Sequence, residues 1–127
     1  MDLNRSPSQI ARSAAEEIRA LNHRTLSPKV YTEPADLANT ADGIVTLLER
    51  LPQTLKQLRG GLRMLEEVME IRTDNGQEPH VAVGLASSHL LVAEDDIESV
   101  ITALRRARAE LSHMAGPWPE GDEDEEE

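Results

Sequence analysis

The chain has 127 residues, with one Trp, one Tyr, no Phe and no Cys. This length predicts a single domain, and the absence of cysteine excludes disulfides, cysteine-ligated zinc and thiol catalysis. The net charge is −11, but seven of the 24 acids lie in residues 120–127, which leaves 17 acids against 13 bases elsewhere. Without surplus positive charge, direct binding to DNA phosphates is disfavoured.

The first predicted element is a helix over residues 6–22, preceded by a flexible lead at residues 1–5. Ser6 is suited to cap this helix, and Pro7 fits its first position. Gln9, three residues after Ser6, completes a capping box. An N-terminal helix with a defined start is therefore expected.

An unbroken heptad of apolar residues marks the second helix, which is expected to begin near Pro34. Its alternating steps of four and three keep one stripe facing a partner along the helix. Pro52 falls inside the series without shifting it, which favours one kinked helix over two separate helices. Gly60 and Gly61 fall away from the stripe, where a close-packed neighbour or a bend would explain them. The stripe comprises Leu37, Ala41, Ile44, Leu48, Leu51, Leu55, Leu58, Leu62, Leu65 and Met69.

A reversal and a third helix complete the predicted elements. Asn75-Gly76 supplies left-handed backbone conformations within residues 72–80. The third helix is expected from about Val81 to Met114, a length of roughly 50 Å. Its matching apolar series comprises Leu90, Ala93, Ile97, Val100, Leu104, Ala107, Leu111 and Met114.

These elements predict an all-α fold. The expected architecture is an antiparallel bundle of three long helices, or four if the chain breaks at Pro52, with coiled-coil-like heptad packing. Residues 6–115 are expected to form the bundle and residues 116–127 a disordered acidic tail. Apolar residues beside both stripes exceed what a two-helix seam requires. We therefore expect the first helix to cover part of them and a second copy, in a homodimer, to cover the rest.

One set of acids resembles the EExxE…ExxD carboxylates of MazG-like all-α nucleotide pyrophosphohydrolases. The resemblance implies magnesium held by these side chains and hydrolysis of a nucleoside triphosphate. The second element carries its acids in swapped order, and the heptad phase turns most of these side chains outward. The pattern therefore favours solvated helix faces over a catalytic site. The acids are Glu66, Glu67, Glu70, Asp95 and Glu98.

Two further features are candidates for binding a protein partner. A basic cluster, formed by Arg105, Arg106 and Arg108, fits an anion or an acidic partner. In the simpler interpretation the cluster is a solvated face in which Arg106 pairs with Glu110. Trp118 stands between two prolines and precedes the acids, which resembles a linear recognition motif. The alternative for this segment is a solubilising terminus.

Three segments together resemble small uncharacterised all-helical proteins common in actinobacterial genomes, a resemblance that implies no activity. The segments are Ser6-Pro7-x-x-Ile10-Ala11, Leu26-Ser27-Pro28 and Arg50-Leu51-Pro52-Gln53.

The expected function is a non-enzymatic interaction or scaffold protein that binds a protein partner and needs no cofactor. Two alternatives stay open. One is the nucleotide pyrophosphohydrolase, and the other is an acidic regulator that occupies a basic, nucleic-acid-binding partner. The sequence contains no apolar run of membrane-spanning length and no apolar signal segment, so the cytoplasm is the expected location and no membrane association is expected.

Overall fold

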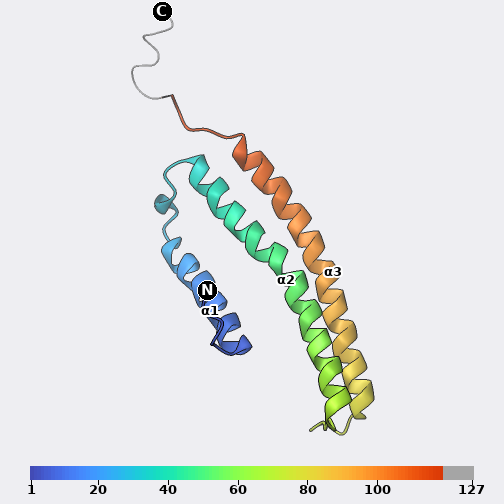
Figure 1. Ribbon diagram of the computed structural model, residues 1–127. Helices are drawn as coiled ribbons and strands as arrows, with labels where there is room; N and C mark the ends of the chain where they lie inside the picture. The colour runs from blue at the N-terminus through green and yellow to red at the C-terminus, as the bar shows by residue number, and fades with distance from the viewer. Residues whose placement is uncertain (119–127) are drawn as a thin grey trace, which may run out of the picture.

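The computed structural model describes residues 1–118, which form three α-helices, one short 3-10 helix and no strand (Figure 1). The prediction of an all-helical chain is therefore confirmed for this part of the protein. The helices are α1 (Pro7–Arg24), η1 (Pro28–Val30), α2 (Pro34–Val68) and α3 (Pro79–Ser112).

Helix α1 begins with the predicted capping box. The backbone N–H of Gln9 donates to Ser6 Oγ at 3.3 Å, and the backbone N–H of Ser6 donates to Gln9 Oε1 at 2.9 Å. Pro7 occupies the first helical turn, where a missing N–H costs nothing. The local residues therefore fix where this helix starts.

Acidic side chains satisfy backbone donors at the starts of the two long helices. The Asp36 carboxylate accepts from the backbone N–H of Thr32 at 2.8 Å and from the Thr32 hydroxyl at 2.9 Å, and these bonds lower the pKa of Asp36. The Glu78 carboxylate accepts from the N–H groups of His80 and Val81, which lowers the pKa of Glu78. Negative charge at a helix N-terminus is also favoured by the helix dipole.

Helix α2 passes through Pro52 without interruption. The structure therefore contains the single long helix, and the four-helix alternative is not formed. Proline removes one backbone hydrogen bond and crowds the carbonyl of Leu48, which is a common cause of helix bending. Figure 1 shows the axis of α2 changing direction near its middle.

Helices α2 and α3 form a hairpin. Ion pairs join Asp42 to Arg108 and Glu66 to His80, so the residue order along the two helices is opposite. Figure 1 shows the two helices side by side over their whole lengths. In the connecting segment Gly76 has a φ of 77°, which is the left-handed conformation expected there.

The contact between α2 and α3 contains the buried side chains of the described residues. They are Val45 on α2 and Val83 and Ile101 on α3. Ile101 is 1% exposed, whereas its neighbour Val100, which the heptad assigns to the contact, is 47% exposed. The contact line on α3 is therefore displaced by one residue from the predicted series at this level.

Helix α1 lies beside the first half of α2 (Figure 1) and contributes no buried residue. Ile18 and Leu21, near its C-terminal end, are half-buried, but Ile10 near its start is exposed. Close packing of α1 into a three-helix bundle therefore stays a prediction. Among residues 1–118, none of the helices combines the length and apolar character needed to cross a membrane.

Candidate functional site

The chain exposes more surface than its mass predicts for a compact monomer. Its accessible area is 10530 Å², against about 6,700 Å² expected for a compact protein of 14.0 kDa. The nine residues outside the described part could add about 1,500 Å² even as a fully extended chain, which is less than half of the difference. An elongated hairpin accounts for part of the rest, but it does not explain why the exposed side chains include so many large apolar residues.

An apolar face runs along one edge of the α2–α3 contact, and its centre lies on the second half of α2. Leu58 is 54% exposed and Leu65 is 39% exposed. On α3, Val100 precedes the buried Ile101 by one residue and lies at the same edge, whereas Leu85, which is 45% exposed, lies further round the helix from the contact. The residues that define the apolar face are Leu51, Leu58, Leu65 and Val68 on α2 and Leu85 and Val100 on α3.

An ionic edge lies on the other side of the same contact. Asp42 Oδ1 is 3.0 Å from Arg108 Nη1, and Glu49 Oε1 is 3.4 Å from Arg105 Nη2. Successive residues of a helix are turned by about 100°, so residues seven apart share nearly the same side. Counted from the buried Ile101, Arg105 lies on one side of the contact on α3 and Val100 on the other. On α2, Glu49 and Leu58 likewise lie on opposite sides of the line through Val45 and Arg59.

Arg59 and Glu94 form the most enclosed ion pair of the described residues, with side chains 19% and 14% exposed. Arg59 Nε lies 2.6 Å from Glu94 Oε2, and Arg59 Nη2 lies 3.2 Å from Glu94 Oε1. This two-pronged geometry is the strong form of an arginine–carboxylate contact. It raises the pKa of Arg59, mainly through the hydrogen bond to Glu94. The pair fixes the relative register of α2 and α3.

Two of the three arginines of the basic cluster form ion pairs between α2 and α3. Arg105 and Arg108 pair with acids of α2, and the binding of an acidic partner by the cluster stays a prediction. The predicted pair between Arg106 and Glu110 is not among the ion pairs formed within residues 1–118. The Arg105 side chain is still 49% exposed, so the interpretation of the cluster as a solvated face stays open.

Trp118 is 81% exposed and lies at the open end of the hairpin. It lines a shallow depression with Thr32 and Glu33, at the start of α2. The acids of the predicted tail lie in residues 119–127, outside the described part of the chain. The acidic-regulator hypothesis depends on those acids and stays a prediction.

The acids of the pyrophosphohydrolase pattern lie at two distant levels of the hairpin. Glu66 is level with His80, whose ring Nδ1 lies 3.1 Å from Glu66 Oε2. Asp95 is 15 residues further along α3, which corresponds to about 22 Å of helix. Glu67, Glu70 and Glu98 are exposed. Within residues 1–118, no three acidic or histidine side chains gather closely enough to hold a metal ion. The geometry therefore does not support a shared magnesium site for these acids.

His80 carries a measurable consequence of its contact with Glu66. The hydrogen bond that the His80 ring donates to Glu66 raises the pKa of His80 above its ordinary value, and the charges of Glu66 and Glu78 act in the same direction. The protonated His80 therefore stabilises the fold below pH about 6.5, and this contribution is lost as the pH rises through the raised pKa. An NMR titration of Glu66→Gln is expected to show a lower His80 pKa than the wild type, and an unchanged value would contradict the contact.

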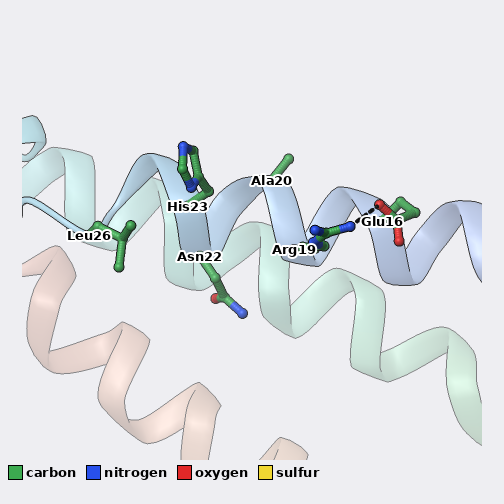
Figure 2. Close-up of a pocket in the computed structure, with 6 residues that line it drawn as sticks. All are labelled: Glu16, Arg19, Ala20, Asn22, His23 and Leu26. Carbon is green, nitrogen blue, oxygen red and sulfur yellow. Dashed lines mark hydrogen bonds and ion pairs between the residues drawn. The ribbon is translucent and has the colours of Figure 1, made fainter.

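A depression along α1 does not have the features of a catalytic site. Figure 2 shows the side chains of Ala20 and His23 on one side of the helix and that of Asn22 on the other. Glu16 and Arg19 pair with each other at 3.4 Å, and both are largely exposed. Ligand sites bring a few polar groups together in an enclosed apolar cavity, and these side chains do not converge.

Comparisons of the chain with protein-family models, with curated proteins and with solved structures give no match. The candidate functional site is therefore assigned from geometry alone. Of the surfaces described above, the apolar face is the candidate functional site. Its own chain leaves it exposed to water, and exposed apolar patches of this kind mark sites of interaction.

Proposed function

We propose that this protein is a non-enzymatic helical interaction protein that self-associates through the apolar face. The observation that carries the proposal is the exposure of Leu58 and Leu65 beside an α2–α3 contact with only three buried side chains among residues 1–118. Large apolar side chains arranged along one side of a helix gain free energy when another apolar surface covers them. A second hairpin supplies such a surface.

The area favours a second copy of this chain as the partner. Stable protein interfaces bury about 800 Å² on each partner, and permanent homodimers bury more. After the residues outside the described part are allowed for, about 2,300 Å² of surface in excess of a compact monomer remains, and part of it belongs to the elongated shape. The remainder is of the order that one partner buries in such an interface. Two hairpins packed through their apolar faces would form an antiparallel helical bundle with coiled-coil-like contacts. The ionic edges would then remain at the solvated sides of the assembly.

The apolar face also suits a symmetric dimer. Leu51, Leu58 and Leu65 are evenly spaced at seven residues, so the stripe has the same pattern when its direction is reversed. A two-fold axis pairs a surface with its own copy in reversed direction. Self-complementarity of this kind supports a homodimer. In this proposal the homodimer is the form of the protein that acts as a scaffold for other proteins.

The dependence of thermal unfolding on protein concentration tests this proposal. If folding and dimer formation are coupled, the unfolding midpoint rises as the protein concentration is increased over a hundredfold range. A monomer unfolds at one temperature regardless of its concentration. A midpoint that does not move with concentration, together with a sharp unfolding transition, would contradict self-association.

A further inference from the structure

We infer that the two copies cross at Gly61, with α2 of one copy antiparallel to α2 of the other, an inference that rests on the proposed self-association. The starting observation is an unexplained glycine. Gly61 lies in the interior of α2, where glycine is the least favourable residue after proline. Contacts within the same chain do not require a glycine here, because a methyl group built on Gly61 would meet no atom within 4 Å.

Gly61 lies on the side of α2 that carries the apolar face. It follows Leu58 by three residues and precedes Leu65 by four, so the three residues share one helix side. Glycine at this place lets a second helix approach the backbone closely. Gly60, one residue earlier, is turned by about 100° towards the ionic edge. The two adjacent glycines therefore have different expected roles.

A two-fold axis beside Gly61 gives both exposed leucines of the second half of α2, Leu58 and Leu65, a partner. Antiparallel packing about this point places Leu58 opposite Leu65 of the second copy, and Leu65 opposite Leu58 of that copy.

The crossing point also lies where the apolar face is accessible. Helix α1 runs beside the first half of α2 and not beside the half that contains Gly61 (Figure 1). A crossing centred further towards the start of α2 would bring a second copy against α1. The position of α1 and the position of the glycine thus favour the same centre.

The first test compares Gly61→Ala with Gly60→Ala in the full-length protein. Both changes improve helix propensity equally, and neither added methyl group meets an atom of its own chain. Gly61→Ala is expected to raise the dimer dissociation constant at least about tenfold, which is 1.4 kcal/mol, because its methyl group separates the crossing helices. Gly60→Ala is expected to leave the dissociation constant within about twofold of the wild-type value, which is below 0.5 kcal/mol.

A second test uses the absence of cysteine from the chain, which makes single-cysteine variants unambiguous. A mixture of Leu58→Cys and Leu65→Cys is expected to form a mixed disulfide on mild oxidation. Each variant alone is expected to form little, because the like positions are seven residues out of register, about 10 Å along the axis, and a disulfide needs Cα atoms within about 7 Å.

The two tests separate this inference from the proposed function. A wild-type dimer in which Gly61→Ala binds as tightly as Gly60→Ala overturns the crossing at Gly61 and leaves self-association intact. Self-linking of Leu58→Cys in preference to the mixed disulfide also overturns it, because that result centres the axis on Leu58. A wild-type monomer overturns both proposals.

Discussion

Replacing Leu58 with aspartate is expected to weaken self-association at least about a hundredfold while the helical hairpin stays folded. In a single chain the Leu58 side chain is 54% exposed, so a carboxylate at this position remains in water. In the proposed dimer the same carboxylate is buried among leucines without a partner. A buried unpaired charge costs more than the 2.7 kcal/mol to which a hundredfold change corresponds.

Gln53→Asp is the matched control for this experiment. Gln53 is an exposed residue of the same helix and lies on the side away from the apolar face. It receives the same charge, so both variants should keep the helical circular dichroism of the wild type. Only Leu58→Asp should lose the dimer in sedimentation velocity. Equal loss in both variants would point to general charge repulsion and would contradict the assignment of the apolar face.

Ile101→Ala is expected to lower the free energy of unfolding by about 3 kcal/mol. Ile101 is 1% exposed and packs in the contact between α2 and α3, so truncation leaves a cavity that the two helices cannot easily close. Val100→Ala, next to it in the chain, is expected to cost less than about 1 kcal/mol in the monomer, because Val100 is 47% exposed in the single chain.

Urea unfolding at a protein concentration low enough to keep the chain monomeric measures both effects without a contribution from self-association. The two variants distinguish the contact in the structure from the contact that the heptad pattern predicts. A larger loss in Val100→Ala than in Ile101→Ala would mean that α3 is rotated relative to the structure described above.

Features set by local residues could be predicted from the sequence. The capping box of Ser6 and Gln9, the helix start at Pro34 and the left-handed conformation of Gly76 all agree with the structure. These features depend on hydrogen bonds and backbone preferences within four or five residues. The continuity of α2 through Pro52 was also predictable, because the apolar series keeps its phase across the proline.

The side of each helix that makes the contact was harder to predict. The contact residues Val45 and Arg59 are two heptads apart, and each follows by one position a residue of the predicted stripe, Ile44 or Leu58. The contact on α2 is therefore turned by about 100° from the predicted stripe at both levels.

On α3 the apolar series places Ala93 in the contact, because it counts only apolar residues. In the structure the neighbouring Glu94 occupies that position in the contact. Contact positions held by ion pairs are missed for the same reason.

From the sequence, the candidate site could be predicted only in general terms, as more apolar residues than the contact between two helices requires. The heptad contains Leu58 and Leu65, but a repeat does not indicate whether its partner helix belongs to the same chain or to another. The hairpin had to be seen to show that α3 leaves these residues exposed. Likewise, the ion pairs of Arg105 and Arg108 depend on the register of two distant segments, which no local pattern specifies.

Sedimentation equilibrium of the full-length wild-type protein tests the central claim most directly. The chain has a mass of 14.0 kDa, and the proposed assembly predicts a species of twice that mass that dissociates on dilution. Measurements over a wide range of concentrations should fit a reversible equilibrium between monomer and dimer. A single species of 14.0 kDa at every concentration would contradict the claim that a second copy covers the apolar face.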